Sequence, residues 1–287
     1  MPRIPTLLLI VAAACDGPGV YAGVSYDDRF GDQTTMDIHV PDNADAARPA
    51  VMLVHGGAWR HGDKDAYTDA AERLARAGYV AATINYRLVP AGIYPAAVQD
   101  CFCALSYLRA NAEAYGIDPE RIAVMGYSAG GHLTSLMGVS ADEPLHAPDC
   151  EWGATGAPAA VIPAGTNHDL RINAGNELVS DFVGGSIDDI PETWDLASPI
   201  THVREGRAAP PYLVIHGGDD VVEIDGATAM VDALRASGNQ ASFLELEGAG
   251  HVTSPTDTGQ LYLQMATEMP EAWLATIDFL DRTLGAP

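Results

Sequence analysis

The sequence predicts an α/β protein with a largely parallel sheet and helices on both of its faces. Short continuous apolar runs, such as 50–54 and 211–215, are typical of strands that are covered on both faces. Stretches with helical spacing separate successive runs, and strands that alternate with helices favour a parallel sheet. No internal repeat or linker-like change in composition interrupts this pattern, so residues 20–287 are expected to form one domain.

The first half of the chain predicts an opening hairpin followed by alternating strands and helices. Residues 36–40 alternate between apolar and polar side chains and stop at Pro41, as expected of a half-buried strand. A helical stretch ends at Gly78, since glycine commonly follows the last turn of a helix. Strands are expected at 24–26, 36–40, 50–54, 80–85 and 121–125, and helices at 66–77, at 96–112 and from about 131.

The second half continues this alternation after one irregular insertion. Residues 167–207 contain only weak helical patterns, and segments that are this long for a loop are usually functional caps or pocket walls. A small cap is therefore expected at about 163–210. The remaining strands are expected at 161–162, 211–215 and 241–246, and the remaining helices at 227–236 and 270–284.

The composition excludes some classes of partner. Asp and Glu number 39 against 15 Lys and Arg, which gives a formal net charge of −24. Such a surface repels nucleic acid and anionic membranes, so no nucleic-acid partner is expected. The scattered histidines and the cysteines lack the spacing of metal ligands, so no metal and no cofactor are expected.

The N-terminus predicts an export signal. The apolar run 6–14 follows Arg3 and is too short to span a bilayer as a helix. Residues 12–15, Ala-Ala-Ala-Cys, resemble the cleavage site of a bacterial lipoprotein. That resemblance implies a signal peptide at 1–14, a lipidated Cys15 as the first mature residue, and a protein anchored to the membrane on its periplasmic face. Ordinary secretion, with cleavage after one of the alanines, is the alternative.

The sequence contains three further cysteines, Cys101, Cys103 and Cys150, and whether they form a disulfide depends on whether the protein is exported. An odd number leaves one thiol free if a disulfide forms. Cys101 and Cys103 lie two residues apart on an expected helix and so face different ways. In an oxidising compartment a bond from Cys150 to one of this pair is expected; otherwise all three are small buried hydrophobic residues.

The pentapeptide Gly-Tyr-Ser-Ala-Gly at 126–130 predicts a catalytic nucleophile. It lies between an expected strand and an expected helix, and strand, tight turn and helix form the context of a nucleophile elbow. On such a turn Ser128 is exposed to a base, and the helix N-terminus favours developing negative charge. The flanking glycines are needed because a Cβ atom would collide in so sharp a turn.

Residues that follow other strands supply a base and an acid for this serine. In open parallel sheets the ligand site lies at the carboxyl ends of the strands. His251, in a glycine-rich loop after the last strand, is the expected base. Asp220 keeps a usual H-G-x-x-D spacing from His216, whereas Asp219 keeps a D-x-x-V spacing to Val222. Asp220 is favoured as the acid because the upstream strand fixes where the loop begins, and Asp219 stays open.

The turn His-Gly-Gly-Ala-Trp at 55–59 predicts an oxyanion hole. Glycines let backbone N–H groups approach a substrate oxygen closely. The amides of Gly57, Ala58 and Ala129 are the expected donors. Trp59 and Tyr127, which adjoin these groups in the sequence, are expected to line the substrate pocket.

With serine, aspartate and histidine in this order, the chain from about Val24 onward resembles the α/β-hydrolase superfamily. Within it, the chain is most similar to carboxylesterases of the BD-FAE-like and hormone-sensitive-lipase-like groups. The segments that carry the resemblance are 55–60, 85–90, 94–100, 115–121, 126–132, 197–201 and 248–251. Ala58, where the lipase-like group usually has glycine, and the shortened turn at Asp219 and Asp220 depart from the pattern.

This resemblance implies an α/β-hydrolase fold with a small cap and a serine esterase that needs no cofactor. The enzyme would cleave small-molecule esters of short-chain acyl, acetyl or feruloyl type through an acyl-enzyme. An arylformamidase is an alternative, because H-G-G-x-W also resembles kynurenine formamidase, and so is a peptidase with the same triad. A binding lipoprotein without catalysis is the alternative from another class. The motifs specify neither the substrate nor the oligomeric state.

Overall fold

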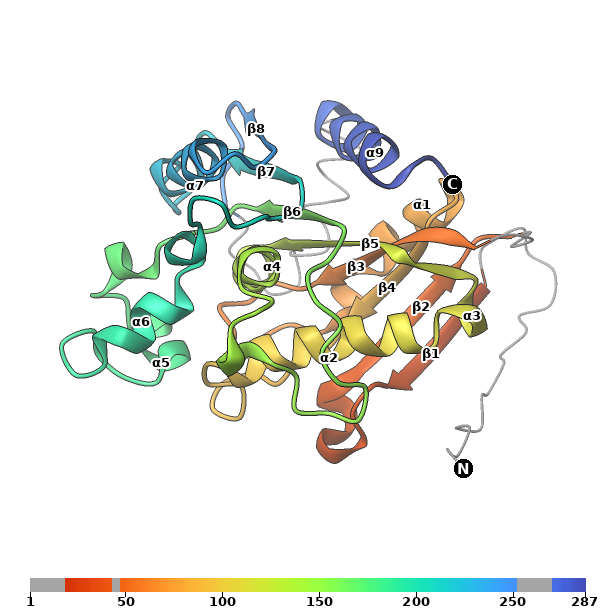
Figure 1. Ribbon diagram of the computed structural model, residues 1–287, viewed down its shortest axis with the longest axis horizontal. Helices are drawn as coiled ribbons and strands as arrows, with labels where there is room; N and C mark the ends of the chain where they lie inside the picture. The colour runs from red at the N-terminus through yellow and green to blue at the C-terminus, as the bar shows by residue number, and fades with distance from the viewer. Residues whose placement is uncertain (1–18, 43–46, 252–269) are drawn as a thin grey trace.

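A computed structural model of the protein describes residues 19–42, 47–251 and 270–287. Its described residues form an eight-stranded sheet in the order β1-β2-β4-β3-β5-β6-β7-β8 (Figure 1). An antiparallel hairpin opens the sheet, β2 is also antiparallel to β4, and the other neighbouring strands are parallel. The strands are β1 (Gly19–Ser25), β2 (Thr35–Val40), β3 (Arg48–Val54), β4 (Val80–Ile84), β5 (Ile117–Tyr127), β6 (Ala160–Ala164), β7 (Tyr212–Gly217) and β8 (Ala241–Leu246).

Helices cover both faces of this sheet (Figure 1). Along β3, Met52 and Val54 pack with one set of helices, whereas Val51 and Leu53 pack with the other, because side chains alternate along a strand. The first face carries α2 (Ala96–Ala110), α3 (Ala112–Tyr115), α4 (Ala129–Val139) and α7 (Asp225–Ala236). The second carries α1 (Thr68–Arg76) and α9 (Pro270–Leu284). The α/β prediction and the α/β-hydrolase arrangement are confirmed.

The segment between β6 and β7 forms a small lobe, called here the cap. It contains two short helices, α5 (Glu177–Val183) and α6 (Pro191–Ala197), which lie to one side of α4 in Figure 1. Single turns of 3₁₀-helix, η4 (Leu170–Asn173) and η5 (Pro199–His202), join the cap to the sheet. The buried ring of His132 in α4 donates a hydrogen bond from Nε2 to the carbonyl of Ala197, 2.8 Å away.

A disulfide joins Cys103 of α2 to Cys150, and Cys101 is a buried free thiol. The expected bond from Cys150 to one of the two helical cysteines is therefore present. The predicted signal peptide and Cys15 lie outside the described residues. Within the described ranges, no helix is both long and apolar enough to cross a membrane.

Candidate active site

Ser128 occupies the sharp turn between β5 and α4. Its backbone has φ 54° and ψ −121°, a conformation that a residue with a side chain rarely adopts and that costs free energy. A Cβ atom on Gly126 would lie 2.4 Å from the carbonyl oxygen of Gly130, and one on Gly130 would lie 2.0 Å from that of Val54. Both positions therefore require glycine, and the turn lifts Ser128 above the end of the sheet.

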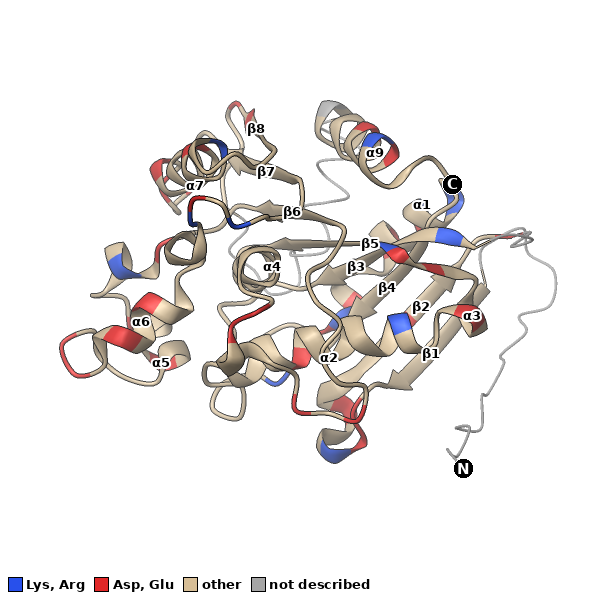
Figure 2. Cartoon of the chain, in the orientation of Figure 1, with Lys and Arg blue, Asp and Glu red and all other residues tan. Residues whose placement is uncertain are grey.

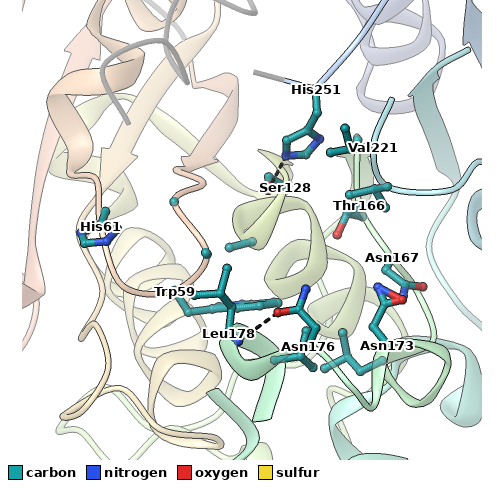
Figure 3. A pocket seen from close by; sticks show the side chains of 17 residues that line it. Trp59, His61, Ser128, Thr166, Asn167, Asn173, Asn176, Leu178, Val221 and His251 are labelled. Carbon is teal, nitrogen blue, oxygen red and sulfur yellow. Dashed lines mark hydrogen bonds between the residues drawn. The ribbon is translucent and has the colours of Figure 1, made fainter. Parts of the chain in front are cut away.

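His251 connects this serine to a carboxylate. Its Nε2 lies 3.1 Å from the Oγ of Ser128 (Figure 3). Its Nδ1 lies 2.8 Å from the Oδ1 of Asp220. Because a carboxylate only accepts hydrogen bonds, Nδ1 carries a proton and Nε2 is free to accept one from the serine hydroxyl. The three side chains thus form a continuous row from β7 through the loop after β8 to the turn after β5.

Of the two candidate acids, Asp220 is the one that faces His251. Its side chain is only 2% exposed, and Oδ1 also accepts a hydrogen bond from the backbone N–H of Val222 at 2.7 Å. Asp219 is exposed, and its backbone N–H donates to the carbonyl of Ala249 at 3.0 Å. This backbone bond fastens the β7 loop to the loop that carries His251, and the His251 ring bonds to Asp220.

The turn at 55–59, called here the H-G-G-A-W turn, has an unusual backbone. Gly57, Ala58 and Trp59 follow one another with φ of 112°, 50° and 57°. A Cβ atom on Gly57 would lie 2.2 Å from the carbonyl oxygen of His61, so only glycine fits there. The Gly57 carbonyl accepts hydrogen bonds from the backbone N–H groups of Arg60 and His61, each at 3.0 Å. In the described part of the chain, no hydrogen bond uses the N–H of Gly57 or Ala58.

His55 holds this turn from behind. Its ring is buried and stacks on Tyr86 with 4.4 Å between ring centroids, and its Nδ1 donates to the Gly56 carbonyl at 2.8 Å. The Tyr86 hydroxyl donates in turn to the carbonyl of His55 at 2.9 Å. Burial lowers the pKa of His55 to about 4, so the ring is neutral near pH 7. The histidine of the H-G-G motif is therefore a support for the turn.

Ser128 and His251 open onto a cavity of about 440 Å³ between the sheet and the cap. Figure 3 shows Trp59 on its floor, Asn167, Asn173 and Asn176 on the cap side, and Val221 beside His251. The lining residues are Gly57, Ala58, Trp59, His61, Ser128, Ala129, Gly165, Thr166, Asn167, Leu170, Asn173, Asn176, Leu178, Val179, Val221, Val222 and His251. The cavity thus collects the predicted nucleophile, base and oxyanion residues at one place.

Tyr127, which the sequence placed in the pocket, does not line this cavity. It is the last residue of β5, and its ring is buried in the core on the sheet face that carries α1 and α9. Successive side chains on a strand point to opposite faces, which explains why Tyr127 and Ser128 diverge. The Tyr127 ring packs against the ring of His251, with 4.9 Å between centroids, so it supports the base from below.

Two buried rings near the cavity were not anticipated from the sequence. Phe182 of α5 stacks on Trp59 at 4.4 Å, and His132 of α4 meets Trp59 edge to face at 5.3 Å. An ion pair between Arg60 and Asp181 joins the same two segments. The cap therefore packs against the H-G-G-A-W turn, which lies more than 100 residues away in the sequence.

Among the described residues, no group of three or more His, Cys, Asp or Glu side chains is placed to hold a metal ion.

Comparisons with known proteins place this arrangement in a family. A model of the BD-FAE family matches residues 36–234. Esterase LipC of Mycobacterium tuberculosis is 38% identical over 71% of this chain and 52% of its own length. The isoprenylcysteine alpha-carbonyl methylesterase ICME of Arabidopsis thaliana is 30% identical over 77% of this chain and 55% of its own length. The chain thus spans about half the length of these curated relatives.

A solved structure of a truncated carbohydrate esterase from gut microbiota is also similar. It superposes with a TM-score of 0.69 at 26% identity, and the match covers 89% of this chain and 96% of that one. The shared fold, the family-model match over most of the chain, and the identity to LipC agree with one another. This chain is therefore a member of the BD-FAE family and has the α/β-hydrolase fold of carboxylesterases.

Proposed function

We propose that this protein is a serine hydrolase that cleaves carboxylic esters through an acyl-enzyme. The observation that carries the proposal is the hydrogen-bonded row Asp220–His251–Ser128, which ends in a cavity beside the H-G-G-A-W turn. The names of the relatives support the choice of an ester, since LipC, ICME and the gut carbohydrate esterase are all described as esterases.

In this mechanism the Oγ of Ser128 attacks the ester carbonyl carbon, and the Nε2 of His251 takes the hydroxyl proton. Asp220 holds the imidazole in the required tautomer and stabilises the imidazolium that forms. The imidazolium then gives the proton to the departing alcohol, which leaves Ser128 acylated. Water, deprotonated by the same imidazole, attacks the acyl carbon, and Ser128 leaves with the proton as the acid is released.

The negative oxygen formed in each attack needs donors, which the amides of Gly57, Ala58 and Ala129 would supply. Ser128 cannot contribute its own amide, because that N–H donates to the carbonyl of Ala164 at 2.9 Å. Ala129 begins α4, so its N–H has no partner within the helix. Donors fixed in this way stabilise the charge without reorganising, and one of them is typically worth about 2.7–4 kcal/mol.

We infer further that the acyl group is short, or is an acetyl or feruloyl group, and that the substrate is a small molecule. The cavity of about 440 Å³ falls in the usual range for small-molecule sites. LipC is named only as an esterase, ICME as a methylesterase and the gut protein as a carbohydrate esterase, so their names support ester cleavage more strongly than any one substrate.

Steady-state kinetics on p-nitrophenyl acetate test the proposal. Wild-type protein is expected to turn over this ester, and Ser128→Ala is expected to fall to the rate of the buffer. The same preparation is assayed on N-formylkynurenine and on a dipeptide anilide, and both are expected to react more slowly than the ester. Full activity in Ser128→Ala would defeat the proposal, and a faster formamide or peptide reaction would assign the triad to that bond instead.

We also propose that the protein is exported and anchored through a lipid on Cys15. The support is the apolar run at 6–14 before Cys15, together with the Cys103–Cys150 disulfide, because disulfides persist in oxidising compartments. Expression in a Gram-negative host tests this: the wild type should enter the detergent fraction with a lipid-sized mass increase, and Cys15→Ser should not. Recovery of both proteins from the soluble periplasm would favour ordinary secretion.

A further inference from the structure

The cavity is lined by a mixture of apolar and polar side chains. The apolar ones include Trp59 of the H-G-G-A-W turn, Leu178 of the cap and Val221 of the loop after β7. The cap side carries the side-chain amides of Asn167, Asn173 and Asn176 (Figure 3). Among the described residues, no Asp, Glu, Lys or Arg lines the cavity. The cap therefore brings three side-chain amides to the cavity, and no acidic or basic side chain.

For two of these asparagines, hydrogen bonds to the backbone identify which end of the side-chain amide is the oxygen and which is the NH₂ group. The Oδ1 of Asn176 accepts a hydrogen bond from the N–H of Leu178 at 2.9 Å, and the Oδ1 of Asn167 accepts one from the N–H of Asp169 at 3.0 Å. An N–H group can bond only to the amide oxygen, so these contacts identify the NH₂ group as the other end. The two oxygens are thus engaged with the backbone.

The NH₂ groups of both residues are available as donors. No hydrogen bond from either nitrogen is found within residues 19–42, 47–251 and 270–287. Figure 3 shows the amide nitrogen of Asn176 turned toward the space below Ser128. The hydroxyl of Thr166 lies on the same side of the cavity. A substrate beside Ser128 would therefore meet amide donors from the cap together with the apolar side chains of the cavity.

We propose that the side-chain amides of Asn167 and Asn176 donate hydrogen bonds to the substrate and select uncharged esters with an acceptor oxygen beyond the reacting ester group. The inference rests on the proposed function, because the cavity is the one that Ser128 and His251 share. The oxygen can belong to the acyl group or to the alcohol; the chemistry recognised is the same, and the substrates below separate the two.

The charge of the protein argues that the selected group is neutral. A carboxylate or phosphate in this cavity would find no lysine or arginine among the described lining residues, and the formal net charge of −24 opposes its approach. Acidic residues also mark both cap helices (Figure 2), Glu177 and Asp181 on α5 and Glu192 and Asp195 on α6. Amide donors suit ether, carbonyl and hydroxyl oxygens, which need no counter-charge.

Substitutions of Asn176 can separate its role as the helix cap of α5 from its proposed role as a hydrogen-bond donor to the substrate. Its oxygen caps α5, and aspartate and serine cap helices about as well as asparagine. Asn176→Asp and Asn176→Ser therefore keep the cap but lose the NH₂ donor, and the serine variant does so without adding a charge. Asn167→Asp keeps the contact with Asp169 in the same way. Equal thermal unfolding temperatures in the variants and the wild type show that the fold is retained.

Two pairs of esters test whether the amides donate hydrogen bonds to the substrate. Within each pair, one CH₂ group of the first ester is replaced by an oxygen atom in the second. The acyl pair is p-nitrophenyl pentanoate and p-nitrophenyl methoxypropanoate, and the alcohol pair is pentyl acetate and ethoxyethyl acetate. For each protein, the ratio of kcat/KM for the oxygen-bearing ester to that for its apolar partner is measured. Each ratio cancels effects that act equally on both members, and the serine variant excludes an effect of the charge that aspartate adds.

In at least one pair, this ratio is expected to fall about two- to ten-fold in both Asn176 variants, the range for loss of one neutral hydrogen bond. The pair that responds shows whether the acyl group or the alcohol faces the cap. Unchanged ratios in both pairs for both Asn176 variants and for Asn167→Asp would overturn the inference while leaving ester hydrolysis intact. If the wild type hydrolyses none of the four esters, the proposed function fails, and the inference fails with it.

Discussion

Phe182 of the cap lies flat against Trp59 of the H-G-G-A-W turn, with 15° between the ring planes. The Phe182 carbonyl also accepts a hydrogen bond from the N–H of Tyr94 at 2.8 Å, which fixes the end of α5 beside this turn. Trp59 and Ala58 both hold positive φ, a conformation that persists only where surrounding contacts enforce it. The cap thus supports the backbone whose amides are proposed to bind the oxyanion.

Replacing Phe182 with leucine should lower kcat about ten-fold with little change in KM. Loss of a whole oxyanion donor costs ~10²–10³ in kcat, and a displaced turn weakens donors without removing them. Steady-state kinetics on p-nitrophenyl acetate give the two constants. Phe102→Leu is the control, because Phe102 of α2 is also buried but belongs to neither the cap nor the turn. An equal fall in kcat in both variants would indicate general loss of packing.

The two aspartates after β7 should differ sharply in their importance. Asp220→Asn should lower kcat by about four orders of magnitude, the cost of the same change in serine proteases, because the imidazole loses its tautomer and its counter-charge. Asp219→Asn should stay within about two-fold of the wild type, since only its backbone makes the contact with Ala249. Comparable losses in the two variants would refute the assignment of Asp220.

The buried histidines should make folding sensitive to acid. Burial lowers the pKa of His132 to about 4 and that of His168 to about 3, so both are neutral in the folded protein. Below about pH 6.5 the unfolded chain binds protons that the folded protein does not, so the free energy of unfolding falls with pH down to the folded pKa. The slope is at most about 1.4 kcal/mol per pH unit for each histidine.

Chemical denaturation at a series of pH values measures this slope. His168→Asn should flatten it, because asparagine can still accept the hydrogen bond from Ser135 but cannot be protonated. The exposed His61 gives the matched variant, His61→Asn, which should keep the wild-type slope. An unchanged slope in His168→Asn would show that this histidine does not contribute to acid sensitivity.

The Cys103–Cys150 disulfide should contribute about 2–4 kcal/mol to the free energy of unfolding. It links residues 47 apart in the sequence, and a cross-link of that span restricts the unfolded chain. Denaturation with and without reductant gives the difference for the wild type. Cys150→Ser should show the lower stability without reductant and no further response to it, whereas Cys101→Ala should respond as the wild type does. A wild type indifferent to reductant would contradict the prediction.

Most of the sheet could be predicted because its strands are short apolar runs between helical stretches. Val51 and Met52 pack into the cores on opposite faces of the sheet, so β3 has no polar face and its sequence is a continuous apolar run. Ser128, His251 and the acid were predictable for a related reason. Each follows a strand, and the carboxyl ends of parallel strands meet at one edge of the sheet.

The sequence could not decide features that depend on contacts between distant segments. Asp219 and Asp220 follow the same strand, and the hydrogen bond between Asp220 and His251 identifies which of them is the acid. Phe182 and Asn176 lie in a cap with little periodicity, so neither the stacking of Phe182 on Trp59 nor the place of Asn176 in the cavity wall could be predicted. Tyr127 was misplaced because its neighbour in the sequence points to the other face of the sheet.

Covalent labelling tests whether Ser128 is the nucleophile of an acyl-transfer reaction. The protein is treated with a fluorophosphonate, digested, and analysed by peptide mass spectrometry. One adduct per chain is expected, on Ser128, with greatly slowed labelling in His251→Ala and none in Ser128→Ala. No adduct on the wild type, or an adduct that persists on another residue in Ser128→Ala, would contradict this role of Ser128.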